Sequence, residues 1–375
     1  MEEVKVVNKN KTIRNYSLDI LKILAICFVC SYHFSLNNVG FAHIDSFTFS
    51  SFINTLFFMI NTMCIPLFFM VNGALLLNKP VNLKKHIKKS MVLILAFLIW
   101  RIITIFSIGL ANGLDFSTVG LKNFINGIFL FGSFPGVDLA HFWFIPMLLS
   151  LYIMYPLFSY LFFNNEKQIN KYVYVILVLL LAFMIIGGDF VLIQKCLFKK
   201  VYTNFSGIMN FNPFGLARSG YIFYFLLGGI IFKYKNSFKN IKWYIILSVF
   251  SFSLMWLFAY WHFQDVFWDY IFGGYNLLPT VLMTTSLFLL CLKIPNEKID
   301  KYKFLSCPIK AVGGNTLTIY YTHWIIGYTF LQTVVPYITK YGLFTNAIKA
   351  ICFVVIGTLF GVVLKKIPIV KNLVS

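Results

Sequence analysis

Charged residues are scarce in this chain. Asp, Glu, Lys and Arg make up 12% of its 375 residues, whereas soluble domains average about 25%. Hydrophobic residues reach 59%, which is more than one globular core can bury. The scarcity of charge excludes a water-soluble globular protein and indicates a chain that uses lipid as its solvent.

Acidic residues are the rarest of the charged types. The chain has 12 Asp and Glu against 32 Lys and Arg, a net charge of +20. In a soluble protein this excess would indicate nucleic-acid binding. Here the lysines cluster in short loops between apolar runs, which is the topology signal of a membrane protein. We therefore expect no nucleic-acid partner.

Metal-binding patterns are also absent. The seven cysteines form no Cys/His cluster with zinc spacing. Cys27 and Cys30 are spaced as C-x-x-C, but they lie in an apolar run, where packing is the expected role of small side chains. We predict no metal site.

Ten stretches are apolar over roughly the 20 residues that a transmembrane helix needs. They predict an all-α, polytopic membrane protein with about ten transmembrane helices. The first has no signal-peptide cleavage site and should be retained. The second contains Pro66, which indicates a kinked or broken helix. The stretches are 18–36, 52–77, 91–110, 142–163, 172–190, 214–232, 243–261, 276–293, 311–331 and 343–364.

The segments between these stretches alternate in charge. One set holds 23 Lys and Arg and the opposite set holds five, so the positive-inside rule places both termini in the cytoplasm. We predict one membrane domain over 1–375, with cytoplasmic tails at 1–17 and 365–375 around a helix bundle at 18–364. The opposite set includes an amphipathic piece, LKNFINGIFLFG, typical of an interfacial helix. The basic set is 1–17, 78–90, 164–171, 233–242, 293–310 and 365–375.

The first stretch carries three polar residues in LDILKILAICFVCSYHFS. At about 100° per residue, Lys22 and His33 lie only about 20° apart around a helix axis, and Asp19 lies about 40° from His33. Lys22 and His33 are separated by roughly 16 Å along the axis. One stripe with three polar groups should face a protein interior or a watery cavity, because lipid exposure is costly.

Each of these residues also has a structural interpretation. Lys22 could extend to the membrane surface with Asp19 as its i,i+3 partner. His33 could be a hydrogen-bonded histidine at the far boundary of the membrane. An imidazole in a cavity is equally the commonest general base.

The segment RNYSLDILKILAICFVCSYH, from Arg14 to His33, resembles the first span of the acyltransferase 3 family of bacterial membrane acyltransferases. That family has an Arg, then Leu-Asp, then Arg or Lys followed by His at this spacing. A second segment, PLFFMVNGALLL, is similar to the family's P-x-F-F-x-x-S-G, with Asn72 in place of the usual Ser. Further resemblances are HFWFIPMLLSLYIMYPLF, GYIFYFLLGGIIF and VGGNTLTIYYTHWII, in the family's order.

The resemblance implies an enzyme that transfers an acyl group from cytoplasmic acyl-coenzyme A, usually acetyl-coenzyme A, to an acceptor at the outer face. Such acceptors are commonly sugar hydroxyls of surface polysaccharides or lipid-linked precursors. The donor is a substrate, and no permanently bound cofactor is expected. Membrane lipid and polysaccharide-biosynthesis proteins would be partners, in the bacterial cell membrane.

The same resemblance gives the stripe a direction. Arg14 and Lys22 would hold the donor's phosphates, with part of the 79–90 segment as a further candidate. His33 would take the proton from the attacking hydroxyl, or would itself carry the acyl group. Asp19 is too far from His33 to orient it, so we expect it to pair with Lys22 or Arg14.

Four further residues are candidate substrate-binding groups. Arg101 lies mid-span, where it either contacts the thioester or an anion, or pairs structurally with a carboxylate or backbone carbonyls. Asp138 and His141 could bind sugar hydroxyls or anchor the start of a helix. His323 is either catalytic or packed and hydrogen-bonded.

Two other functions compete with an enzyme. A non-catalytic transporter or exporter of a polysaccharide precursor would also need many spans and buried charges, although no paired repeats are found. A membrane sensor that binds ligand without turnover is the third alternative. Acylation of the glycan distinguishes the enzyme from both.

Overall fold

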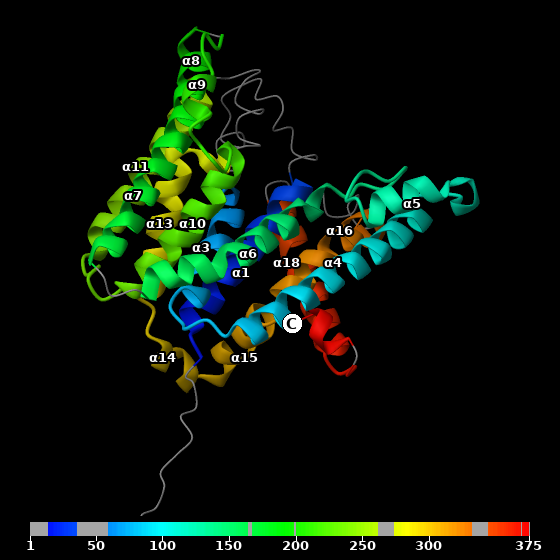
Figure 1. Ribbon diagram of the computed structural model, residues 1–375. Coiled ribbons are helices and arrows are strands. Elements are labelled where there is room, and N and C mark those ends of the chain that lie inside the picture. The colour runs from blue at the N-terminus through cyan, green and yellow to red at the C-terminus, as the bar shows by residue number, and fades with distance from the viewer. Residues whose placement is uncertain are drawn as a thin grey trace, which may run out of the picture.

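The computed structural model describes residues 14–35, 59–163, 167–198, 200–261, 274–331, 344–368 and 370–374. Within these ranges the chain is a bundle of helices (Figure 1), and its sole β feature is an isolated bridge between Phe134 and Val137. The all-α prediction is confirmed for the described part of the chain. The amphipathic piece forms a helix of its own, α5, which packs against the second half of α4.

The long helices are α1 (Tyr16–Ser35), α3 (Cys64–Leu76), α4 (Leu83–Ala111), α6 (Phe144–Phe163), α7 (Lys167–Met184), α10 (Leu216–Lys233), α11 (Ile241–Trp261), α13 (Leu278–Leu292), α15 (Lys303–Gly313), α16 (Thr316–Ile326) and α18 (Phe344–Leu364). The short ones are η2 (Phe116–Thr118), α5 (Leu121–Ile128), η3 (Ala140–Trp143), η4 (Ile185–Asp189), α8 (Phe190–Phe198), α9 (Ser206–Met209), η5 (Gly274–Asn276), α14 (Asn296–Lys301), η6 (Gly327–Leu331) and η8 (Lys371–Val374).

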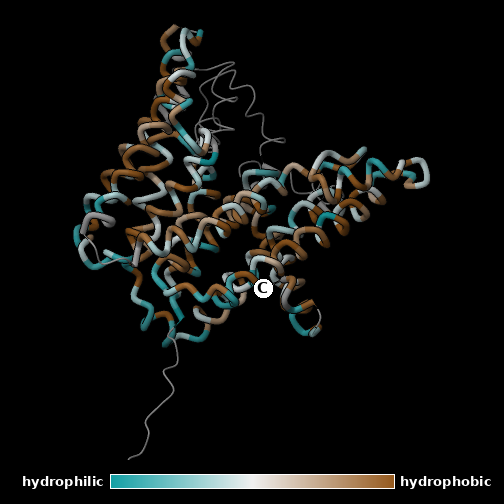
Figure 2. Tube along the Cα trace, in the orientation of Figure 1, coloured by the Kyte–Doolittle hydropathy of each residue, from teal (hydrophilic) through white to brown (hydrophobic). Residues whose placement is uncertain are grey.

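Six helical segments of the described residues are long and apolar enough to cross a membrane. Hydrophobic residues run along most of their length (Figure 2). Two shorter apolar helices lie at Ile241–Leu254 and Leu278–Leu292. Each of the ten predicted stretches overlaps a helix. The six segments are Tyr16–His33, Met59–Leu76, Leu83–Ala111, Ala140–Leu161, Lys171–Gln194 and Ala347–Leu364.

Three helix boundaries bear on the site. The second stretch is interrupted by a turn at Thr62 and Met63, just before Pro66, so the predicted break is confirmed. Helix α4 begins eight residues earlier than the predicted stretch, at Leu83, because the Asn82 side chain accepts a hydrogen bond from Lys85 N and caps it. The residues up to 90 are therefore helix and not loop.

The ninth stretch also differs from its prediction. The sequence predicts one helix over 311–331, but α15 ends at Gly313 and a new helix, α16, begins at Thr316. Two consecutive glycines favour a break between helices. The break leaves the last carbonyls of α15 free to bind other groups.

Helices α3 and α10 pack with their backbones in close approach. A Cβ at Gly73 would lie 1.8 Å from the Phe225 carbonyl oxygen, and one at Gly228 would lie 2.1 Å from the Met70 carbonyl oxygen. Small residues at crossing points are how helices associate inside a membrane. This contact fixes α3, which forms part of the site described below.

Replacing Gly73 with alanine should therefore separate α3 from α10 and destabilise the protein by about 1–3 kcal/mol. Thermal unfolding of the detergent-solubilised protein, followed by tryptophan fluorescence, measures the loss. Gly120→Ala is the matched control, because a Cβ there meets nothing within 4 Å and the backbone φ is −66°. Equal melting temperatures for the two variants would contradict the close packing.

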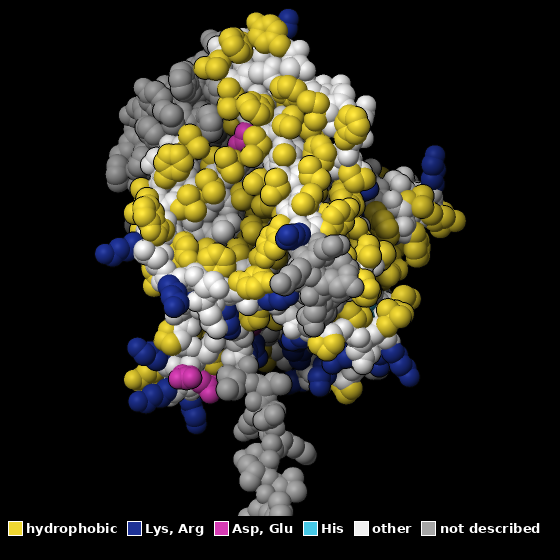
Figure 3. All heavy atoms as spheres, turned by 60° about the vertical axis from the view of Figure 1, so that its left-hand side comes forward, with side chains coloured by type: hydrophobic (Ala, Val, Ile, Leu, Met, Phe, Trp, Pro, Cys, Tyr) yellow, Lys and Arg dark blue, Asp and Glu magenta, His cyan; other side chains and the backbone are white. Residues whose placement is uncertain are grey.

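Lysine and arginine side chains gather at one end of the molecule, which carries α14, α15 and the start of α1. We call this the basic end. Figure 3 shows these side chains at the lower edge, below a surface that is mostly hydrophobic. Helix α1 runs from the basic end into the bundle and packs against α3, α13, α15, α16 and α18. Its polar stripe therefore faces other helices.

Candidate functional site

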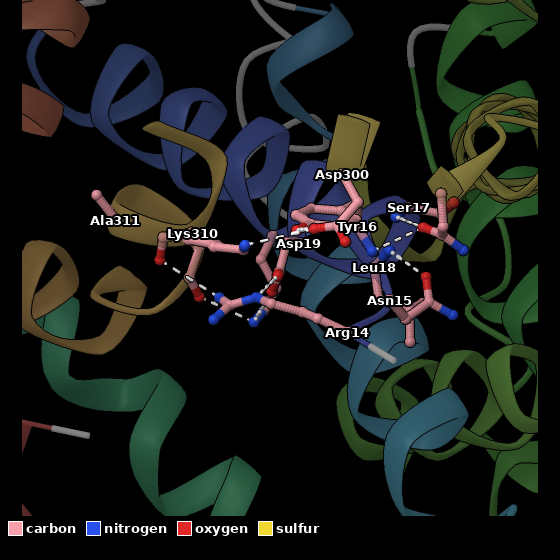
Figure 4. A network of polar contacts seen from close by, with 12 residues as sticks. Arg14, Asn15, Tyr16, Ser17, Leu18, Asp19, Asp300, Lys310 and Ala311 are labelled. Atoms are coloured by element: carbon pink, nitrogen blue, oxygen red, sulfur yellow. Dashed lines mark hydrogen bonds and ion pairs between the residues drawn. The ribbon is translucent and has the colours of Figure 1, made fainter. Parts of the chain in front are cut away.

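Asp19 is the centre of an ion network at the basic end of α1. Its carboxylate accepts from Arg14 Nε at 2.5 Å and lies 2.6 Å from Lys22 Nζ. Arg14 also donates to the Lys310 carbonyl oxygen at 3.3 Å (Figure 4). A Cβ at Gly313 would lie 2.9 Å from Asp19 Cβ, so glycine lets α15 approach this closely. The pairing predicted for Asp19 is confirmed, and both cations share it.

The C-terminal end of α15 faces the same network. Lys22 Nζ donates to the Gly313 carbonyl oxygen at 2.8 Å, and Lys365 Nζ donates to the Gly314 carbonyl oxygen at 2.5 Å. The C-terminus of a helix carries partial negative charge and favours cations. Burial, and then the charges of Arg14 and Lys22, lower the pKa of Lys365. Three cations around one carboxylate leave a positive field suited to an anion.

A cavity of about 540 Å³ adjoins this network. Lys22 lines it from α1, and Lys85, Lys88 and Lys89 line it from the first turns of α4. The three α4 lysines are exposed. No Asp or Glu is among the described residues that line the cavity. Its mouth is therefore basic, with charge that no lining carboxylate offsets.

Beyond the lysines the walls of the cavity are mainly apolar. Val71 and Leu75 of α3 lie on one side, and Leu148 of α6 on another. Asn72, which stands where the resembling family usually has Ser, accepts a hydrogen bond from the Tyr152 hydroxyl at 3.2 Å. A cavity with mainly apolar walls and a basic mouth fits a ligand with an anionic head and a thin, weakly polar arm.

Tyr320 and Phe144 also line the cavity, with ring centroids 5.4 Å apart. Tyr320 donates its hydroxyl to the backbone carbonyl of His141. Its ring centroid lies 5.7 Å from that of His323 and 6.0 Å from that of His141. Tyr320 therefore stands between the cavity and a group of histidines.

Three histidines from three helical segments meet here, and we call them the histidine cluster: His33 of α1, His141 of η3 and His323 of α16. The ring centroid of His323 lies 5.5 Å from that of His33 and 5.6 Å from that of His141. Trp324 packs 4.7 Å from both His33 and His141. The structure thus brings together three residues that the sequence singled out separately.

The three imidazoles differ in exposure and hydrogen bonding. His141 is 1% exposed and His323 is 0% exposed, whereas His33 is partly exposed. His323 Nδ1 lies 2.5 Å from the Tyr320 carbonyl oxygen and must donate to it. Neither ring nitrogen of His141 has a hydrogen-bond partner among the described residues. His33 is the most accessible of the three, as a proton acceptor for a substrate has to be.

Because α1 is continuous from Tyr16 to Ser35, the eleven residues between Lys22 and His33 span roughly 16 Å. Lys22 lines the cavity and belongs to the ion network, and His33 belongs to the histidine cluster. The stripe predicted from helical spacing therefore connects a cationic site to an imidazole site through the interior of the bundle.

Arg101 lies outside the cavity lining. Its guanidinium donates to the carbonyl oxygens of Gly127 at 2.7 Å and Gly132 at 3.0 Å. It also lies over the rings of Phe97 and Phe142, with 5.6 and 5.3 Å to their centroids. Of the two roles considered for Arg101 from the sequence, this geometry matches the structural one, in which backbone carbonyls accept hydrogen bonds from the guanidinium.

Asp138 lies beside the histidine cluster and forms hydrogen bonds with the residues around it. Its carboxylate accepts from Ala140 N at 2.8 Å, at the start of η3. Trp324 Nε1 donates to its backbone carbonyl at 2.9 Å, and the Tyr328 hydroxyl lies 3.4 Å from its carboxylate. Asp138 thereby anchors the segment that carries His141 to the helix that carries Trp324.

From the sequence alone, the α4 lysines are expected only as part of a loop. Lys85, Lys88 and Lys89 are spaced i, i+3 and i+4, which places them on one face of a helix. That signal becomes readable once the Asn82 cap is recognised as the start of α4. Trp324, which contacts two of the histidines, was missed because nothing in the pattern separates it from an ordinary interfacial aromatic.

A model of the acyltransferase 3 family, described as an acyltransferase domain, matches residues 15–366, nearly the whole chain. Searches of curated proteins and of solved structures gave no match. The matched range contains Asp19 and Lys22 of the ion network, the α4 lysines of the cavity and all three members of the histidine cluster. The chain belongs to the acyltransferase 3 family of membrane acyltransferases.

Proposed function

We propose that this protein transfers an acyl group, in the simplest case acetyl, from acyl-coenzyme A to a sugar hydroxyl of a cell-surface polysaccharide or its lipid-linked precursor. One observation supports this most strongly. A basic-mouthed cavity adjoins a cluster of three histidines, and α1 contributes to both through Lys22 and His33, which are about 16 Å apart along the helix. A carrier of unmodified glycan has no need of an imidazole cluster at the end of a cationic cavity.

In this proposal the basic end faces the cytoplasm, where acyl-coenzyme A is made. The charge of the loops supports this orientation, with ten spans and both termini on the cytoplasmic side of a bacterial cell membrane. The phosphates of the donor would bind Arg14, Lys22 and the α4 lysines. Its pantetheine arm would lie along the apolar walls of the cavity.

The chemistry requires one proton acceptor. The acceptor hydroxyl attacks the thioester carbonyl, and His33 takes the hydroxyl proton. The carbon–sulfur bond then breaks, the sulfur leaves as the coenzyme A thiolate, and the imidazolium returns the proton to it. The products are an ester and coenzyme A, so atoms and charges balance without another reactant.

Tyr320 lies on this path. The thioester would meet the Tyr320 ring before the histidine cluster, because the ring lines the cavity and packs against His323 and His141. A displacement of this ring would complete the path to His33. Donor-bound protein should therefore differ from the free protein at Tyr320.

Replacing Lys22 with methionine should raise the KM for acetyl-coenzyme A roughly tenfold, because a charged hydrogen bond contributes about 1.5–3 kcal/mol. The kcat should change little, since Lys22 is about 16 Å from the reacting atoms. Steady-state transfer of radiolabelled acetyl groups measures both constants. Lys22→Arg should restore most of the affinity, and Lys298→Met removes an exposed charge at the same end as a control. A loss of kcat at unchanged KM would contradict this role.

The function itself is tested by mass spectrometry of surface glycans from cells with and without the protein. We expect an acyl substituent on the glycan only in cells that have it. Glycans of unchanged mass but lower surface abundance in the deletion strain would instead support an exporter.

A further inference from the structure

Lys349 of α18 is a buried cation that the site described above does not use. It is 2% exposed, and its Nζ has no hydrogen-bond partner among the described residues. No ion pair joins it to a carboxylate in the described part of the chain. A charged side chain inside a membrane protein without a partner is costly, and such residues usually mark a binding or transport function.

The position of Lys349 relates it to the histidine cluster. Phe353, one helical turn away on the same face of α18, contacts His323 with ring centroids 6.4 Å apart. Lys349 lies about 6 Å further along the axis, away from the basic end. Helix α18 packs against both α1 and α16, which carry His33 and His323. Lys349 is therefore on the side of the cluster opposite to the donor cavity.

The direction of the Lys349 side chain distinguishes two roles for it: binding the acceptor, or stabilising charge on the thioester oxygen. Side chains of a helix lean toward its N-terminus. The N-terminus of α18 points away from the basic end, since Lys365 at its other end binds Gly314 there. The Cα–Cβ bond of Lys349 is accordingly tilted away from the basic end, and so away from the side on which the thioester would enter. This favours a ligand that approaches from the acceptor side over stabilisation of charge on the thioester oxygen.

No carboxylate in the described part of the chain pairs with this cation. Asp138, the described acidic residue beside the histidine cluster, uses its carboxylate on Ala140 N and on the Tyr328 hydroxyl. His141 of the histidine cluster also has both ring nitrogens without hydrogen-bond partners among the described residues. Two polar groups that are more than nine-tenths buried and have no partner among the described residues therefore lie near His323: His141 by direct ring contact, and Lys349 one helical turn from Phe353, which contacts His323.

We propose that Lys349 binds an anionic group of the acceptor and so selects acceptors whose acylated unit carries a phosphate or a carboxylate. This rests on the proposed function and specifies its substrate class. Phosphate, as in a lipid diphosphate-linked sugar, and carboxylate, as in an acidic sugar, share the same chemistry of an oxyanion bound by an ammonium group. A neutral hydroxyl-bearing sugar would leave the cation unpaired in the complex.

The test uses cells without their own copy of the gene that express wild type, Lys349→Met, Lys349→Arg or Lys122→Met. Lys122 is an exposed lysine of α5 and serves as the charge control. Mass spectrometry gives the acyl content of the surface glycan and the charge and composition of the acylated unit, which separates phosphate from carboxylate. The purified proteins give the melting temperature and the affinity for acetyl-coenzyme A.

We expect Lys349→Met to lower the initial rate of acylation at least about tenfold and to leave acetyl-coenzyme A affinity unchanged. Lys349→Arg should keep most of the activity, and Lys122→Met all of it. The melting temperature of Lys349→Met should equal or exceed that of wild type, because a buried unpaired charge is removed. The acylated unit should be anionic.

Three results would overturn the proposal: full acylation by Lys349→Met, a neutral acylated unit in wild type, or a lower melting temperature with acylation lost in proportion to folded protein. The last would indicate a structural role. These outcomes are distinct from failure of the proposed function, in which wild type adds no acyl group to any glycan and does not bind acetyl-coenzyme A.

Discussion

Replacing His33 with alanine should abolish acyl transfer, with a fall in kcat of at least about 100-fold, while the helix bundle stays folded. A positioned general base contributes about 10²–10⁴ to the rate, and His33 is the accessible member of the histidine cluster. Its ring packs against Trp324 and His323 of α16, so its loss removes one contact between α1 and α16 while the packing of α1 against α3, α15 and α18 remains. Transfer of radiolabelled acetyl groups by the purified protein measures the effect.

Two controls accompany this variant. His33→Ala should bind acetyl-coenzyme A with wild-type affinity, because the cations of the cavity are untouched. His86→Gln changes a histidine whose ring packs on Tyr155, outside the cluster, and should retain transfer. Acylation that persists in His33→Ala would show that another residue is the base. Loss of donor binding as well would show that the fold had failed.

The second large effect is expected at the mouth of the cavity. Replacing Lys85, Lys88 and Lys89 together with glutamine should raise the KM for acetyl-coenzyme A roughly tenfold to hundredfold. Each exposed pair of a lysine and a donor phosphate contributes up to about 1 kcal/mol to binding. The kcat should remain close to that of wild type. The difference should shrink at high salt, because salt screens exposed charges. Initial rates at two ionic strengths measure both effects.

The matched control removes the same charge from the same end of the molecule. Lys298, Lys301 and Lys303 are exposed on α14 and α15 and do not line the cavity. Their replacement with glutamine should leave the KM within about twofold of wild type, apart from a small long-range effect. If both triple variants raised the KM equally, the general field of the basic end would be responsible and the cavity would not be a specific donor site.

Helical spacing was sufficient to predict the organisation of α1. Asp19, Lys22 and His33 share a stripe because 3.6 residues per turn fixes their angles, and the cost of charge in lipid directs that stripe inward. The same reasoning gave Asp19 its cationic partners, which the ion network confirms. Interactions within one helix depend on local geometry, and the sequence carries that geometry directly.

Convergence between helices could not be predicted in the same way. His141 and His323 are 182 residues apart in the chain, and only the packing of η3 against α16 places their rings 5.6 Å apart. The start of α4 was misplaced because its first turns are as basic as a loop. The cap from Asn82 to Lys85 N that extends the helix is a single hydrogen bond.

Lys349 illustrates a further limit of sequence patterns. Near the end of an apolar helix, a lysine is typical of a side chain that extends to the membrane surface. Its 2% exposure depends on the neighbours that cover it, and a single helix gives no information about them. Arg101 shows the reverse case, in which a conspicuous intramembrane cation is satisfied by the carbonyls of Gly127 and Gly132.

The central claim is that an acyl group crosses from a donor at the basic end to an acceptor on the opposite side. Sealed vesicles from cells that express the protein, prepared in both orientations, test it with radiolabelled acetyl-coenzyme A added outside. We predict labelled glycan in the lumen of inside-out vesicles, and none in right-side-out vesicles or in inside-out vesicles with His33→Ala. Equal labelling in both orientations, or glycan that enters the lumen without label, would contradict the account.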